Sequence, residues 1–241
     1  MNATPETTIR EIVATDFRTA AVFQRFGLDF CCNGCRTLDQ GCRDAGADPD
    51  ALLRELDSVM SAPSSAVPRF ATWDIPTLVH YIVANHHAYV RESLPLLLQH
   101  TRKVANVHGE RHPELVHIAR LFERVAAEMT EHMMKEEQIL FPFVSDLSEA
   151  SSSGRPIPRP PFGTVGNPIR MMEQEHQFVG DAMAEIRALT DGYRLPADAC
   201  TTYRVCFKEL EAFESDLHAH VHLENNILFP KALAIETGGR S

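Results

Sequence analysis

The sequence lacks an excess of basic residues. Its 23 Lys and Arg stand against 33 Asp and Glu, which gives a formal net charge of -10 over 241 residues. A surface that binds nucleic acid must neutralise phosphates with Lys and Arg, and this chain has few of them to spare. We therefore expect no direct nucleic-acid partner.

Long apolar runs are absent too. No stretch approaches the ~20 apolar residues that a helix needs to span a bilayer, and the first residues, MNATPETTIR, have no basic segment followed by an apolar core. The six cysteines form two groups rather than the dense framework of a small secreted scaffold. We expect a cytoplasmic protein with reduced cysteines and no membrane partner.

Patterns typical of β-strands are scarce as well. Four long segments instead show helical periodicity with start signals, namely Asp74, Pro113, Asn167 before a proline, and Pro196. The polar and proline-rich segment 148–166 reads as a loop, long enough to cross the end of a bundle. The sequence therefore predicts an all-α fold built on a four-helix bundle.

A separate small helical domain is expected near the N-terminus. Residues 61–72, SAPSSAVPRFAT, have the proline and serine content of a linker. Before them, two short amphipathic segments lie on either side of the turn CCNGC at residues 31–35. We expect this domain over residues 1–60, a linker over 61–72 and the bundle over 73–241.

Two nearly identical strings occur in the second part of the chain. HMMKEEQILFP begins at His132, and HVHLENNILFP begins at His220. Residues four apart lie on one face of a helix, so His132 with Glu136 and His220 with Glu224 each present an imidazole and a carboxylate together. On an exposed face such a pair contributes a few tenths of a kcal/mol. These pairs lie in apolar stripes, where a carboxylate needs a cation or a hydrogen-bond network.

The repeat also extends backwards, because HAYV at His87 and HQFV at His176 precede the two HxxxE pairs at almost the same spacing. A duplicated helical hairpin would bring four imidazoles and two carboxylates to one point. That set is too large for one tetrahedral zinc but suits two non-haem irons with carboxylate and oxo bridges and about one open position each. Ferritin-like bundles differ, since they use Glu-x-x-His. The predicted metal ligands are His87, His132, Glu136, His176, His220 and Glu224.

Neighbouring residues leave alternatives. His86 competes with His87 for one ligand position, and only the match between HAYV and HQFV favours His87. Glu128 and Glu175 could support the centre from outside the ligand set, although solvated helix carboxylates are the slightly favoured reading. His108 is expected to be a surface or turn residue.

The cysteines have their own alternatives. Cys32 and Cys35 form a CxxC beside Cys31, and a CxxC can be redox-active, metal-binding or coincidental. Next to a second thiol in a glycine-containing turn, we favour thiol chemistry. Cys200 and Cys206 are expected to be packed within a helix.

These motifs resemble known families. The arrangement of His and HxxxE is similar to a hemerythrin-like domain, but the oxygen carriers of that fold have a second His where this chain has Gly180 and an Asp where it has Glu224. The strings DFCCNGC, HMMKEEQILFP, HLENNILFP and ACTTYR more closely resemble the repair of iron centres family. That resemblance covers nearly the whole chain, and it implies a hemerythrin-like di-iron bundle, a double-cysteine N-terminal domain and the same six ligands.

The resemblance also implies a function. Members restore iron-sulfur clusters after nitrosative and oxidative stress, so we expect damaged iron-sulfur proteins and nitric oxide or another diatomic molecule as partners, with iron supply as one route and Cys31 and Cys32 as assisting thiols. A module that binds or senses nitric oxide is the alternative, and an enzyme that reduces nitric oxide is the third. The resemblance favours a repair protein over an enzyme, and the sequence leaves a homodimer open.

Overall fold

The computed structural model describes residues 3–62, 68–157 and 159–238. Within these ranges the chain forms helices and no strand, apart from an isolated bridge between Thr8 and Thr37. No helix in this described part of the chain is long and apolar enough to cross a membrane. The predicted all-α fold is confirmed.

The chain divides into two compact units. The first, which we call the bundle unit, is Val79–Leu217, and the second, the terminal unit, combines Met1–Leu78 with His218–Ser241. Helix α10, Thr201–Leu223, is continuous through the boundary between them.

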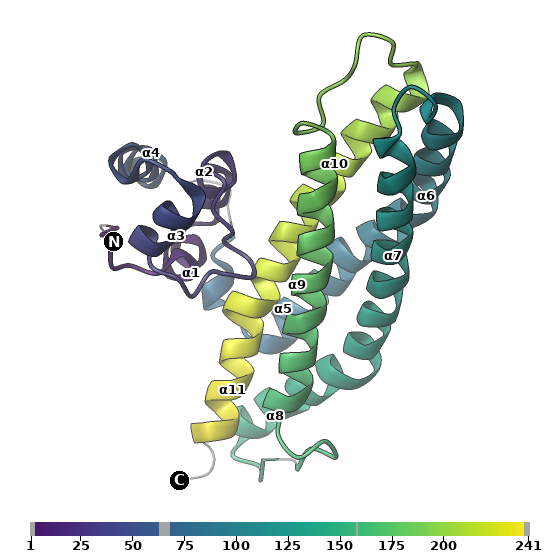
Figure 1. Ribbon diagram of the computed structural model, residues 1–241. Helices are drawn as coiled ribbons and strands as arrows, with labels where there is room; N and C mark the ends of the chain where they lie inside the picture. The colour runs from purple at the N-terminus through teal and green to yellow at the C-terminus, as the bar shows by residue number, and fades with distance from the viewer. Residues whose placement is uncertain (1–2, 63–67, 158, 239–241) are drawn as a thin grey trace. The chain divides into compact units, whose positions relative to one another are not determined.

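Helices α6, α7, α9 and α10 form the bundle (Figure 1). Polar contacts join α6 to α7, α7 to α9, α9 to α10 and α10 to α6, so the four helices close into a ring. The first three helices are Ala88–His108, Glu114–Lys135 and Gly166–Leu189. The contacts are Arg102–Glu123, His117–Glu185, Arg187–Glu214 and His100–Glu209.

The observed first residues of three helices can be compared with the start signals predicted from the sequence. Asp74 caps α5, Ile75–Tyr81, because its carboxylate accepts a hydrogen bond from the Thr77 N–H at 2.9 Å. Helix α7 starts directly after Pro113. Helix α10 starts later than Pro196 suggests, because a turn from Pro196 to Ala199 closes first, with a backbone bond of 3.1 Å.

The start of the predicted loop 148–166 is helical instead. Helix α8, Phe141–Ser153, continues through it because Leu147 and Ala150 are fully buried and carry the apolar stripe onward. The helix ends at Gly154, whose φ of 68° is a left-handed conformation that suits glycine.

Three π-helical turns interrupt the bundle helices. They are η3, Ile82–His87; η4, Glu136–Leu140; and η5, Glu224–Leu228. The last two each precede the proline of a repeated LFP, Pro142 or Pro230. A proline cannot donate to the carbonyl four residues earlier and its ring crowds that carbonyl, so a wider turn ahead of it is favoured. Both η4 and η5 begin at the glutamate of an HxxxE pair.

The terminal unit packs short helices around a core of its own. Capping boxes start two of them, with Thr8 paired to Glu11 and Thr37 paired to Gln40. In the expected linker 61–72, residues 63–67 lie outside the described part of the chain. The helices are α1, Ile9–Thr15; α2, Ala20–Arg25; α3, Leu38–Ala45; α4, Pro49–Ser61; and α11, Phe229–Gly238.

Candidate metal centre

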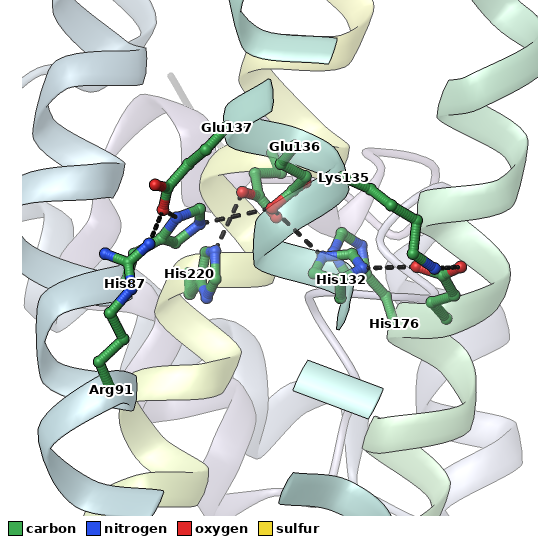
Figure 2. Close-up of polar contacts among 10 residues, drawn as sticks. His87, Arg91, His132, Lys135, Glu136, Glu137, His176 and His220 are labelled. Carbon is green, nitrogen blue, oxygen red and sulfur yellow. Dashed lines mark hydrogen bonds and ion pairs between the residues drawn. The ribbon is translucent and has the colours of Figure 1, made fainter. Parts of the chain in front are cut away.

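Four predicted ligands converge inside the bundle unit (Figure 2). His87 ends η3, His132 lies near the end of α7, Glu136 opens η4 and His176 lies in α9, and each is at most 2% exposed. The Glu136 Oε2 lies 3.3 Å from the His132 Nε2 and 3.4 Å from the His87 Nε2. The Nε2 atoms of His132 and His176 are 2.9 Å apart.

Carboxylates outside this set orient two of the imidazoles. The His87 Nδ1 is 2.6 Å from Glu137 Oε1, and the His132 Nδ1 is 2.8 Å from Glu175 Oε2. Since a carboxylate only accepts, each Nδ1 carries the ring proton when the imidazole is neutral. The Nε2 lone pairs then point toward Glu136, which is the tautomer that a metal-binding histidine needs.

Cations hold these outer carboxylates in turn. Arg91 pairs with Glu137, and Lys135 pairs with Glu175. Burial acts to raise the pKa of Glu137 and of Glu175, but hydrogen bonds from the histidine and the cation at each outweigh it and lower both pKa values below their ordinary range. Glu175 therefore contacts His132 from outside the predicted ligand set, so the slightly favoured reading of a solvated carboxylate was wrong for this residue. Glu128 is half-buried. The sequence analysis missed Glu137.

The donor set fits a cation. Both oxygens of Glu136 are buried, and neither has a hydrogen-bond partner among the described residues. This carboxylate faces nitrogen lone pairs, so acceptor meets acceptor in a dry interior, at a cost of several kcal/mol unless a positive charge compensates. Ligand atoms of His132, Glu136 and His176 all lie within 4.8 Å of one another. Imidazole and carboxylate together suit a divalent transition metal.

The second HxxxE pair lies on α10 and η5 in the terminal unit. The His220 Nε2 is 3.0 Å from Glu224 Oε1, and both residues are fully buried. Within α10, Phe213 and Leu217 are buried in the bundle unit. His220 and Glu224 follow Leu217 by three and seven residues, so they continue the same stripe of the helix.

The opposite stripe of α10 and η5 binds the cysteine turn. The Asn226 Nδ2 donates to the carbonyl oxygens of Phe30, at 3.1 Å, and Cys31, at 3.2 Å. It also lies 3.1 Å from the Nδ1 of His222, which is fully buried with its ring 5.6 Å from that of Phe17. Burial lowers the pKa of His222 to about 4. One helix segment therefore carries His220 and Glu224 on one side and binds the double-cysteine turn on the other.

Asp29 organises the cysteine turn. Its Oδ1 accepts from the backbone N–H of Cys31 at 3.0 Å and of Cys32 at 2.9 Å, and its Oδ2 accepts from Asn33 at 2.7 Å. The Sγ atoms of Cys31 and Cys32 are 3.8 Å apart. A hydrogen bond with Cys32, together with burial and the Asp29 charge, raises the pKa of Cys31 well above its ordinary value. Cys35 is exposed.

The remaining candidates are placed elsewhere. The His86 Nδ1 is 2.9 Å from Asp216 Oδ1, so this imidazole has its own partner. Cys206 is buried in α10, as expected. Two expectations were wrong: His108 is buried, at 5% exposure, because it packs beneath the start of α10, and Cys200 is exposed because it precedes that helix.

Comparison with known proteins agrees with this geometry. The Hemerythrin HHE cation binding domain matches residues 78–232, and ScdA_N, a Domain of Unknown function (DUF542), matches residues 5–60. A protein of Yersinia pestis (strain Pestoides F) is 35% identical over 216 residues, which cover 90% of this chain and 91% of the relative. One of Enterobacter sp. (strain 638) is 33% identical over 226 residues, 94% and 96% of the two chains. Both are named Iron-sulfur cluster repair protein YtfE. The chain belongs to this family.

Membership in the YtfE family accounts for both parts of the sequence. The hemerythrin match includes both HxxxE pairs and both upstream histidines, and the ScdA_N match includes the double cysteine. The resemblance to the repair of iron centres family is confirmed.

Proposed function

We propose that this chain repairs iron-sulfur clusters damaged by nitrosative or oxidative stress and that a di-iron centre is its working part. The observation that carries the proposal is the buried Glu136 carboxylate, which faces two imidazole Nε2 atoms and has no hydrogen-bond partner in the described part of the chain. The named function of relatives that align over about 90% of the chain supports it.

The proposed ligands are four from the bundle unit and two from the terminal unit. The complete burial of His220 and Glu224 within the terminal unit supports a ligand role for both. The sequence repeat supports it as well, since His132 and Glu136 occupy the matching positions of α7 and η4. Two irons with both glutamates bridging would use this set fully. When bound, they supply an open coordination position and redox chemistry.

The chain's own residues do the holding and orienting. Glu137 and Glu175 keep the Nδ1 protons on His87 and His132, which leaves Nε2 free to bind. The proposed partners are damaged iron-sulfur proteins, with nitric oxide or a similar diatomic molecule as a small ligand. The six free cysteines support the cytoplasm as the proposed compartment.

The double cysteine is proposed as an assisting thiol pair. Asp29, Cys31 and Cys32 offer ligand atoms within 4.8 Å of one another. Thiols accept soft metal ions and exchange with other sulfur species. The turn that carries both cysteines is hydrogen-bonded to the helix segment that carries His220 and Glu224. The thiols can therefore assist without a large movement of the turn.

The test uses the iron-loaded full chain and a purified dehydratase whose cluster has been damaged by nitric oxide. Recovery of dehydratase activity and iron per chain are measured for the wild type, Glu136→Gln and the control Glu185→Gln, whose carboxylate pairs with His117 at the surface. We expect about two irons and full repair for the wild type and the control, and loss of both for Glu136→Gln.

Three outcomes would contradict the proposal. A single tightly held metal in well-loaded protein would exclude the dinuclear centre. Removal of nitric oxide without any recovery of the dehydratase would replace repair with nitric oxide binding, and reductant-dependent turnover of nitric oxide would indicate an enzyme.

A further inference from the structure

Cys200 lies directly before the first residue of α10, Thr201. It precedes His220 by 20 residues in the sequence. Its side chain is exposed, and its carbonyl accepts the first hydrogen bond of the helix, from the Arg204 N–H at 3.1 Å. Cys200 is therefore the N-cap residue, where unpaired backbone N–H groups favour negative charge on a side chain.

A buried imidazole is directed at this thiol. His108, the last residue of α6, is 5% exposed and places its Nε2 3.2 Å from the Cys200 Sγ. Its Nδ1 is buried and has no hydrogen-bond partner in the described ranges. The Tyr203 ring packs against it at a centroid distance of 5.2 Å. Unlike His87 and His132, this histidine has no carboxylate partner in the described residues, and the cysteine sulfur is its polar contact.

We propose that Cys200 and His108 form a nucleophile and base pair that undergoes thiol–disulfide exchange with a small anionic disulfide such as glutathione disulfide. His108 Nε2 accepts the thiol proton as the Cys200 Sγ attacks one sulfur of the disulfide. The disulfide bond breaks, a mixed disulfide forms on Cys200, and the departing sulfur takes the proton. The small disulfide is the oxidant, and one equivalent of free thiol is released.

The surroundings suit an anionic partner. Arg111 is 70% exposed, and its guanidinium is 3.0 Å from Asp198, two residues before Cys200. Arg204 is exposed one helical turn after Cys200. Together with the N-terminus of α10, these cations can receive the carboxylates of glutathione while sulfur chemistry occurs at Cys200.

The test compares two cysteines within the same folded protein. Full-length wild type is incubated with glutathione disulfide at pH 7, and adducts are quantified by peptide mass spectrometry over time. Cys35 is the internal control, because it is exposed and has no histidine contact among the described residues. We expect Cys200 to be modified faster than Cys35 on the order of tenfold or more.

The variant His108→Gln separates base catalysis from exposure. It is expected to reduce the Cys200 rate to about that of Cys35, while the Cys35 rate and the iron content remain unchanged. Equal rates at the two cysteines in the wild type would overturn the proposal without any variant. An unchanged Cys200 rate in a folded His108→Gln would overturn it too, whatever the outcome of the cluster-repair assay.

Discussion

The Nδ1 of His87 lies 2.6 Å from the Oε1 of Glu137, the residue that directly follows the proposed ligand Glu136. Adjacent residues on a helix point about 100° apart, so the two glutamates reach different atoms. In the π-turn that both open, Glu136 faces Nε2 and Glu137 faces Nδ1 of the same imidazole. Glu136 is therefore placed to bind the proposed metal, whereas Glu137 orients the His87 imidazole.

The first prediction is that these outer carboxylates set metal affinity. Glu137→Gln or Glu175→Gln should weaken iron binding by about 10- to 100-fold, because an amide no longer fixes the Nδ1 proton as a carboxylate does. Iron retention against a graded chelator measures the effect. Glu185→Gln is the control, and parallel retention curves for all three variants would show that orientation does not matter.

The second prediction distinguishes the adjacent histidines. His87→Ala should lose most of the iron, since its Nε2 faces Glu136 and its Nδ1 is held by Glu137. His86→Ala should keep the iron, because its imidazole pairs with Asp216 instead. Iron content is measured in the two purified variants. Loss of iron in His86→Ala and retention in His87→Ala would mean that His86, one residue earlier, is the ligand.

The sequence predicts the helices well, and the repeated HxxxE pattern marks residues that the fold buries, because both depend on local periodicity. Apolar residues at helical spacing mark the buried face, and His132 with Glu136 lies in that stripe. The π-turns were missed, although the proline of each LFP was a visible signal, since a proline disturbs the turn before it.

Contacts between distant segments outside the repeated His and Glu pattern could not be predicted. In the sequence, nothing distinguishes Glu137 from a solvent-exposed helix carboxylate. Only the folded structure shows its contact with His87. The bond from Asn226 to the Cys31 carbonyl joins residues 195 apart, and no local pattern indicates it. Cys200 was expected to be packed because its helix was placed too early, and the turn that delays the helix exposes the thiol.

The third prediction concerns a buried carboxylate outside the metal centre. Glu214 is 2% exposed and accepts from the Tyr193 hydroxyl at 2.9 Å and the Arg187 Nε at 2.9 Å. Tyr193→Phe removes one donor to a buried charge and should lower the free energy of unfolding by about 1.5–3 kcal/mol. Urea unfolding measures it. Tyr203→Phe is the matched control, since its hydroxyl has no hydrogen bond in the described residues, and equal losses in both variants would contradict the prediction.

The fourth prediction is a pH dependence from Cys206. Burial raises the pKa of this thiol to about 12, whereas an unfolded cysteine titrates near ~8.5. The folded chain therefore keeps the Cys206 proton to a higher pH than the unfolded chain does. The contribution of this thiol to the free energy of unfolding is complete below about pH 8.5 and is lost as the pH rises toward 12. The difference in unfolding free energy between wild type and Cys206→Ala should shrink by about 1.4 kcal/mol per pH unit in that range. A difference that stays constant from pH 8 to 11 would refute it.

The last prediction separates holding iron from using it. Cys31→Ala with Cys32→Ala should leave iron content and the visible spectrum nearly unchanged, because the proposed ligands are imidazoles and carboxylates and the turn stays bonded to Asn226 through backbone carbonyls. Cluster repair should nevertheless fall, since the paired thiols that accept soft iron or exchange with sulfur species are gone. Cys35→Ala is the control for loss of a nearby exposed thiol. Repair is measured with the purified dehydratase and in cells that lack the native protein, at matched protein levels. Full repair by the double variant would leave the cysteine pair a structural element and the bundle as the sole working part.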